Sequence, residues 1–146
     1  GDVPQKLKEE AKRIVDARGQ VILPGFVDAH THLVHGGSRE NELAMKLAGA
    51  SYMEIHKVGG IGATVRATRA ASAGELYDKA FTTLDHMLIN GTTTVESKSG
   101  YGLDLETELK CLEVNKRLQK NHPIDIISTY MGAHSTPPEF KDRTDD

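Results

Sequence analysis

The stretch Val27–His32, which reads VDAHTH, decides how the rest of the chain is interpreted. It follows the short apolar run Val21–Phe26, VILPGF, so the pattern predicts a strand that ends in polar residues. Side chains alternate along a strand, so His30 and His32 lie on one side of an extended backbone. Two imidazoles arranged in this way are able to bind one metal ion. Because a closed structural site needs four ligands, the pair indicates an open site completed from elsewhere.

The pair alone does not settle whether metal is bound, because His-x-His also occurs by chance between two structural histidines. Its position favours ligation. Pro24 and Gly25 precede an apolar strand that ends in the pair, and the carboxyl ends of strands are where (β/α)8 barrel enzymes carry their ligands. Neutral imidazoles suit Zn, Fe, Ni and related ions.

Strand and helix patterns alternate along the rest of the chain. The Ser72-x-x-Glu75 capping box predicts the start of one helix. Strands are expected at residues 25–29, 92–96 and 124–130, and helices at 40–50, from 72 and at 104–120. This order predicts a parallel α/β sheet with right-handed crossovers. A Rossmann-like open sheet is the alternative, disfavoured because its glycine fingerprint is absent and each strand ends in a polar loop.

Two further segments carry expectations of their own. Residues 13–16 and 20–23 flank Gly19 and are expected to form a β-hairpin before the first strand of the sheet. The glycine-rich stretch Gly59–Gly62 lacks the spacing of a phosphate-binding loop, so a flexible active-site loop is expected there.

Several separated motifs resemble one enzyme family. Residues 24–32, PGFVDAHTH, resemble the first-strand signature of the amidohydrolase superfamily, metal-dependent hydrolases built on a (β/α)8 barrel. Residues 33–40 (LVHGGSRE), 98–103 (KSGYGL) and 132–134 (GAH) are similar to the imidazolonepropionases, the ring-opening hydrolases of histidine degradation. The likeness runs from about residue 14 to the C-terminus.

The resemblance implies a partial TIM (β/α)8 barrel. A complete barrel needs about 250 residues, so 146 residues correspond to about the first three β/α units and to a fragment of the parent enzyme. Residues 1–23 are then the N-terminal tail and a remnant β-hairpin of a small flanking β-sandwich. Residues 24–146 are the N-terminal portion of the barrel.

The resemblance also implies the site and its reaction. One divalent ion, Zn or Fe, is bound by His30 and His32, and the remaining ligands and the general base are expected beyond residue 146. The substrate is 4-imidazolone-5-propanoate, hydrolysed to N-formimidoyl-L-glutamate. Arg39, Tyr101 and His134 are implied as substrate contacts, with the Arg39 guanidinium suited to a carboxylate. Apart from the motif, Arg39 reads as a solvated side chain and His134 as a buried histidine. The isolated chain is expected to be inactive.

Other reactive side chains fit structural roles better. His35 lies near the metal pair but outside it, in a position where the family pattern leads us to expect an aromatic or small residue. His122 lies beside a helix, and Lys98 does not correspond to the carboxylated lysine of two-metal relatives. Cys111 reads as an apolar residue in a helix stripe.

Composition limits the partners. A net charge of -3 gives no electrostatic reason to expect nucleic acid or an anionic membrane, and no apolar run approaches the length of a membrane span. A single cysteine and the absence of a secretion-signal pattern fit the cytoplasm. A small-molecule substrate is expected, together with a homo-oligomer or self-association through unpaired strand edges.

Two functional alternatives stay open. Another amidohydrolase, such as a deaminase or hydantoinase, shares the His-x-His pair. A noncatalytic metal-binding or assembly module is the alternative from a different class.

Overall fold

A computed structural model describes residues 2–141 and residue 143. Its centre is a parallel sheet of three strands, β1 (Phe26–Thr31), β2 (Thr92–Lys98) and β3 (Asp125–Thr129), in the order β1-β2-β3. The expected succession of parallel strands joined by helices is therefore confirmed. The strand order is consistent with part of a (β/α)8 barrel, although one half of a doubly wound sheet has it too.

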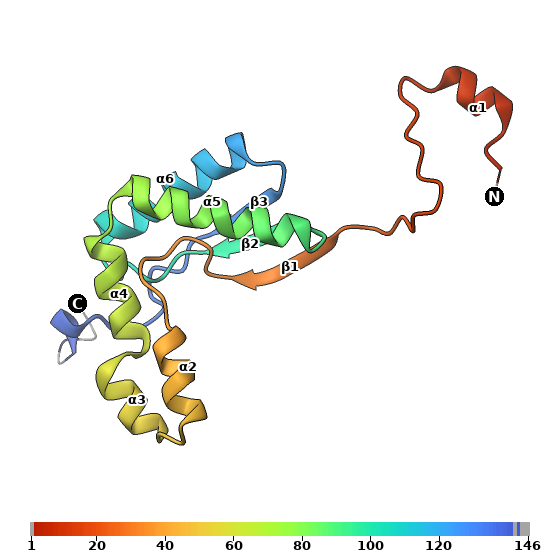
Figure 1. Cartoon of the computed structure of the whole chain (residues 1–146). Helices are drawn as coiled ribbons and strands as arrows, with labels where there is room; N and C mark the ends of the chain where they lie inside the picture. The colour runs from red at the N-terminus through yellow and green to blue at the C-terminus, as the bar shows by residue number, and fades with distance from the viewer. Residues whose placement is uncertain (1, 142, 144–146) are drawn as a thin grey trace.

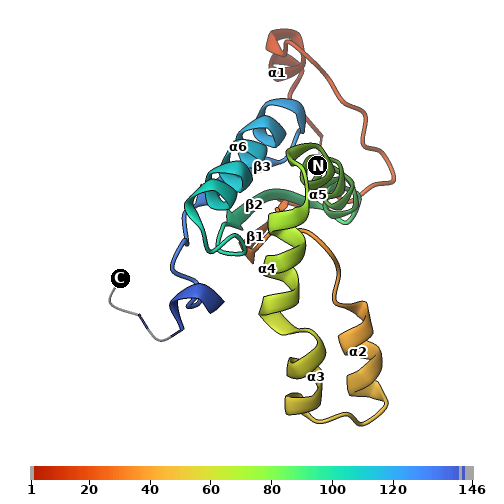
Figure 2. The ribbon, with the colours of Figure 1, turned by 90° about the vertical axis from the view of Figure 1, so that its left-hand side faces the viewer.

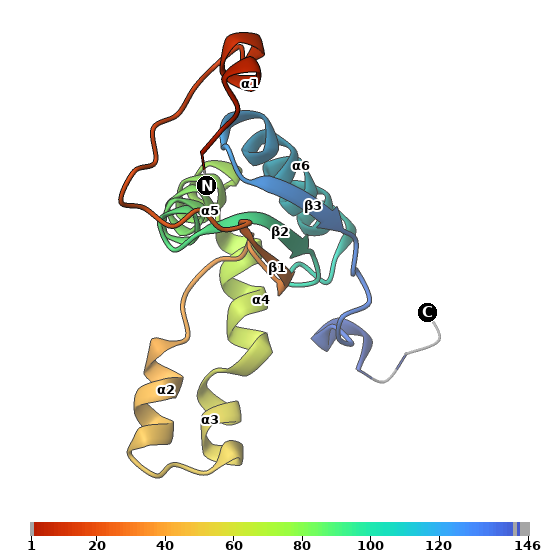
Figure 3. The ribbon, with the colours of Figure 1, turned by 90° about the vertical axis from the view of Figure 1, so that its right-hand side faces the viewer.

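Helices α5 (Ala73–Ile89) and α6 (Leu105–Asn121) pack side by side against one face of the sheet (Figures 1 and 3). The capping box forms as expected, since the Ser72 hydroxyl accepts from the Glu75 amide at 3.2 Å and the Glu75 carboxylate accepts from the Ser72 amide at 2.8 Å. The core lies between helices and sheet, and it contains Leu76, Ala80, Leu84, Val95, Cys111, Val114, Leu118, Ile124 and Ile126.

Three further helices connect β1 to α5. Helices α2 (Glu40–Leu47) and α3 (Tyr52–Val58) extend away from the sheet, and α4 (Gly60–Ala70) leads back to it (Figure 2). The flexible loop expected at Gly59–Gly62 is wrong, because α4 begins at Gly60. Burial of Thr64, Val65 and Thr68 along α4 stabilises a helix there in spite of its glycines.

The β-hairpin expected before the sheet is also wrong. Residues 13–23 contain a turn at Arg18–Gly19, with Gly19 at φ +78°, but no strand pairing. Val15, Val21 and Ile22 are 71–84% exposed, so this segment packs against no other layer. A two-stranded hairpin without such a layer is only marginally stable. The short helix α1 (Gln5–Glu10) precedes this segment, far from the sheet in Figure 1.

The second face of the sheet carries no helix within the described residues (Figure 3). Val27 and Ile127 are 67% and 57% exposed. Val95 and Ser97 of β2 are buried toward the helices, so alternation places Glu96 and Lys98 on the bare face. The carboxyl ends of all three strands lie at one edge of the sheet. The loops that carry the motifs therefore meet there. A short 3-10 helix, η1 (Pro138–Phe140), follows the last of these loops.

Candidate active site

The loops after β2 and β3 are joined by hydrogen bonds. The Ser99 amide donates to the Thr129 carbonyl at 2.9 Å, and the Met131 amide donates to the Ser99 hydroxyl at 3.0 Å. Gly100 adopts φ +113°, and a Cβ at this position would lie 2.7 Å from the His134 Cβ and from the Met131 carbonyl oxygen. Only glycine therefore allows the two loops to approach this closely.

A buried carboxylate fixes the loop that carries Tyr101. Glu108, on α6, is 2% exposed and accepts hydrogen bonds from the amides of Gly100 at 2.8 Å, Gly102 at 2.8 Å and Leu103 at 2.9 Å. Leu103 has φ +56°, which these bonds help to hold. Sequence reasoning missed Glu108, because a glutamate in a helix gives no sign that a neighbouring loop folds over it.

The aromatic rings of three candidate residues form one cluster. The His32 ring centroid lies 4.4 Å from that of Tyr101 and 4.7 Å from that of His134, and Tyr101 and His134 are 5.6 Å apart. His30 lies beside the cluster, with its ring centroid 6.5 Å from that of His32. The structure thus brings together side chains from the ends of all three strands.

The loop after β1 is anchored in the core and to α4. Leu33 and Val34 are buried in the core, and the Gly36 amide donates to the buried Thr68 hydroxyl at 2.9 Å. These anchors hold His32 in a half-buried position. Burial lowers the pKa of His32, as do the neighbouring His134 and His30, while the Ser99 backbone acts in the opposite direction. The imidazole is thereby kept in its neutral, ligand-competent form.

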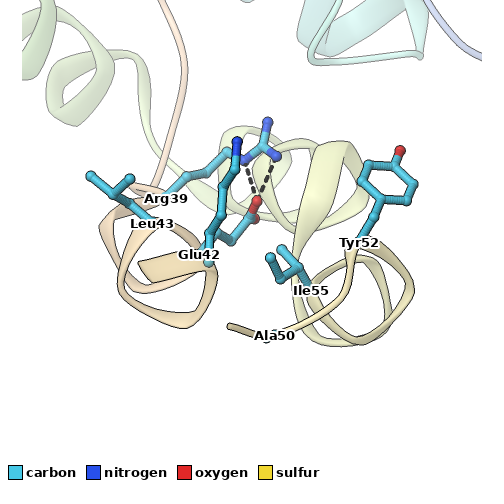
Figure 4. Close-up of a pocket in the computed structure, with 7 residues that line it drawn as sticks. Arg39, Glu42, Leu43, Ala50, Tyr52 and Ile55 are labelled. Atoms are coloured by element: carbon cyan, nitrogen blue, oxygen red, sulfur yellow. Dashed lines mark hydrogen bonds and ion pairs between the residues drawn. The ribbon is translucent and has the colours of Figure 1, made fainter. Parts of the chain in front are cut away.

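Arg39 lies between two hollows. One, of about 320 Å³, is lined by His32, His35, Arg39, Thr64 and Tyr101. The other, of about 500 Å³, lies between α2 and α3 and has no histidine among its described lining residues (Figure 4). The smaller hollow contains three of the predicted site residues and is therefore the candidate active site. His35 and Thr64 were not predicted to belong to it.

The Arg39 guanidinium is held by a neighbouring carboxylate. Its Nε and Nη2 donate to the Glu42 carboxylate at 2.9 and 2.5 Å, as the dashed lines in Figure 4 mark. This ion pair raises the pKa of Arg39. The other Glu42 oxygen accepts from the Gly60 amide at 2.6 Å, so α2 and the start of α4 are tied together at Arg39.

Three other reactive side chains have partners or surroundings outside the lining of this hollow. Cys111 is a buried core residue, and burial raises its thiol pKa to about 11. His122 is buried, and its Nε2 lies 3.3 Å from the Asp85 carboxylate. The Lys98 ammonium pairs with Glu96 at 2.6 Å.

The imidazole pair offers a partial metal site. Among residues 2–141 and 143, no group of three or more His, Cys, Asp or Glu side chains is placed to hold an ion. The Nδ1 atom of His32 is buried and lacks a hydrogen-bond partner within the described chain, which leaves its ring free of competing bonds on that side. Two imidazoles, His32 in the lining of the hollow and His30 next to it in the strand, fit the first half of a ligand set that requires further residues.

Comparison with known proteins identifies the family. The model of the amidohydrolase family matches residues 13–87, just over half of the chain. The chain belongs to the amidohydrolase family. Amidohydrolases are generally metal-dependent, which agrees with the donor set at the end of β1. No helix among the described residues combines the length and apolar character needed to cross a membrane.

Relatives of high identity to this chain carry the name imidazolonepropionase. The protein from Treponema denticola is 73% identical over 143 residues, which are 97% of this chain and 35% of that protein. Relatives from Bacillus cereus (strain ZK / E33L) and Fusobacterium nucleatum are 56% and 55% identical over 99% and 97% of the chain. The chain spans about a third of the length of these curated relatives.

Proposed function

We propose that this chain forms part of an imidazolonepropionase, which hydrolyses 4-imidazolone-5-propanoate to N-formimidoyl-L-glutamate in histidine degradation. The observation that carries the proposal is the 73% identity to the Treponema denticola enzyme over 97% of the chain. The clustering of His32, Tyr101 and His134 at the carboxyl edge of the sheet supports it. Residues 24–146 then supply about the first three units of a (β/α)8 barrel, and residues 1–23 belong to the flanking small domain.

His30 and His32 would hold the metal, one Zn or Fe ion. When bound, this ion supplies a hydroxide at neutral pH and polarises the carbonyl group under attack. The neutral state of His32, favoured by burial, keeps a nitrogen lone pair for the ion. The remaining ligands and the general base are assigned to segments that follow residue 146 in the relatives.

The substrate contacts follow from the chemistry of the hollow. Arg39 would bind the propanoate carboxylate by charge-assisted hydrogen bonds, for which its guanidinium must share or leave the Glu42 carboxylate. The Tyr101 hydroxyl and the His134 imidazole would hydrogen-bond the heterocycle. Their positions depend on Gly100 and Glu108, which fix the two loops that carry them. In the reaction the water oxygen bonds to the ring carbonyl carbon, and a ring C-N bond breaks.

We infer that the chain by itself is inactive, because its described residues offer two of the ligands and no assigned base. The enzyme would be cytoplasmic. Among the described residues no strand pairs with the outer edges of β1 and β3, and Phe26, Val27 and Ile127 are exposed. Self-association or pairing with the rest of the enzyme is therefore expected.

A chimera tests the function. The segment of the Treponema denticola enzyme that matches this chain is replaced by residues 1–146, and the product is assayed with imidazolonepropionate, a hydantoin and a heterocyclic amine. Selective hydrolysis of imidazolonepropionate is expected. Preference for the hydantoin or deamination of the amine would instead assign the site to another amidohydrolase activity. The unmodified relative is the control for folding and metal loading.

A further inference from the structure

We propose that His35 is a further substrate-binding residue, a neutral imidazole whose Nε2-H donates to a carboxylate oxygen in the hollow that it shares with Arg39. The inference deepens the proposed function and rests on it for the identity of the substrate. It is carried by the contacts of Lys79 and by the lining of the hollow.

Lys79, on α5, reaches across to the loop after β1. Its Nζ lies 3.0 Å from His35 Nδ1 and 3.1 Å from the His35 carbonyl oxygen, and it also donates to the Gly37 carbonyl. An ammonium has three N-H groups and no acceptor, so one donor is available for each of these three atoms. A neutral amine would donate to the two carbonyl oxygens and accept from an Nδ1-H, so the charge of Lys79 decides which nitrogen of His35 carries the proton. Burial lowers the pKa of Lys79 and the Glu40 carboxylate raises it.

These contacts select one tautomer of His35. The Gly36 carbonyl oxygen lies 3.2 Å from Nδ1 and could accept a proton from it, but an Nδ1-H would then face the Lys79 ammonium at 3.0 Å. Donation from Lys79 requires a lone pair on Nδ1, so the ring proton resides on Nε2. Burial lowers the pKa of His35, the hydrogen bond to the Gly36 carbonyl acts in the opposite direction, and the Lys79 charge lowers it to a smaller extent; the net shift is downward, toward the neutral ring.

The Nε2-H group is free to donate to a ligand in the hollow. Nε2 makes no hydrogen bond within the described chain, while the His35 ring lines the hollow with His32, Arg39, Thr64 and Tyr101. The ring also contacts Tyr101 edge-on, with centroids 6.1 Å apart, which limits its rotation. A fixed donor is therefore available on a wall of the candidate site.

The charges around the hollow favour an anionic oxygen. Arg39 contributes a permanent positive charge, and the Lys79 ammonium polarises the imidazole from behind, which strengthens Nε2-H as a donor. No carboxylate lines this hollow among the described residues. Since Glu42 already occupies two of the Arg39 donors, a second donor from His35 would complete the binding of the propanoate group.

Nitrogen NMR tests the tautomer without reference to any activity. In the ¹⁵N-labelled 146-residue chain, His35 is expected to show a lone-pair-type Nδ1 and a protonated Nε2. The variant Lys79→Met is expected to release this preference, while circular dichroism verifies that the fold persists. A protonated Nδ1 in the unsubstituted chain would overturn the proposal.

Ligand binding tests the role. The probes are imidazole-4-propanoate and its uncharged amide, titrated calorimetrically into the chimera, so the result does not depend on turnover. His35→Phe is expected to weaken binding of the carboxylate about tenfold or more, the effect of losing one hydrogen bond to a charged group, and to leave the amide unchanged. His35→Gln retains a donor near Nε2 and is expected to restore most of the affinity.

His86 is an exposed histidine on α5, so His86→Phe is the matched control. This variant is expected to leave the affinities for the carboxylate probe and for the amide probe unchanged. Equal affinities of the His35→Phe variant and the unsubstituted protein for the carboxylate would overturn the proposal, as would equal losses for the two probes. A chimera that binds the carboxylate through His35 but fails to hydrolyse imidazolonepropionate would refute the proposed function and leave the role of His35 as an anion contact standing.

Discussion

Replacing Glu108 tests how the loop with Tyr101 is held. Glu108→Gln keeps a carbonyl oxygen for the amides of Gly102 and Leu103, but it turns an NH₂ group toward the Gly100 amide. The Gly100 N-H is then left without an acceptor in a buried position. Glu108→Ala removes the acceptor of all three amides.

The cost follows from the number of amides left unpaired. One buried donor without a partner costs about 1–3 kcal/mol, so Glu108→Gln is expected to lower the free energy of unfolding by about 2 kcal/mol. Glu108→Ala is expected to cost about 4 kcal/mol or more by the same reasoning, with water replacing part of the lost bonding. A loss of this size is a large share of the roughly 5–15 kcal/mol that stabilises a typical domain.

Urea unfolding followed by far-UV circular dichroism measures the effect. With a slope of about 1–3 kcal/mol per molar urea, Glu108→Gln should move the midpoint down by about 1 M. Glu113→Gln on the same helix is the control, because the Glu113–Lys116 pair is exposed and such pairs contribute little. A midpoint for Glu108→Gln equal to that of the control would refute the argument that Glu108 holds the loop.

Three further outcomes are expected. Gly100→Ala should destabilise the fold by about 2 kcal/mol or more in urea unfolding, since both its φ and its surroundings exclude a Cβ, whereas Gly19→Ala, in open space, should cost about 1 kcal/mol. Ser72→Ala should cost about 1 kcal/mol and return the Glu75 pKa, now lowered by Ser72, toward its ordinary value by NMR titration. A carboxyl group whose pKa is lowered by folding stabilises the protein above its unfolded pKa, and this contribution is lost as the pH falls through the folded pKa. The stability difference between the two proteins should therefore narrow in acid, where the Ser72 hydroxyl no longer donates to a carboxylate, and a difference that widens in acid would contradict the cap. Cys111, with its pKa raised to about 11, should react with iodoacetamide at pH 8 far more slowly in the folded chain than in urea, and equal rates would contradict its burial.

Local patterns predicted the elements that local chemistry controls. The capping box at Ser72 set the start of α5, and the β-branched run from Thr92 marked β2. The hairpin expected around Gly19 failed because its strands have no layer to pack on, which is a tertiary condition. Helix α4 was not predicted, because the glycines at residues 59, 60 and 62 have a low helix propensity. Burial of side chains along the helix stabilises it in the folded structure.

In the candidate site, too, the sequence predicted what local motifs determine and missed what tertiary contacts determine. Motif order placed His30, His32, Tyr101 and His134 at strand ends, and the structure brings the last three into ring contact. Glu108 and Lys79 could not be predicted, because their partners are backbone groups of distant loops, and no residue pattern records which amide or carbonyl a side chain meets. Such contacts appear only once the loops are folded against α5 and α6.

The most direct test of the proposed function compares the chimera with its His30→Ala, His32→Ala double variant. Both proteins are purified with one added divalent metal, and metal content and hydrolysis of imidazolonepropionate are measured on the same samples. The proposal predicts about one ion per chain and turnover in the chimera, and loss of both in the double variant, with the folded state verified by circular dichroism. Undiminished metal content and turnover in the double variant would contradict the assignment of the metal to this histidine pair.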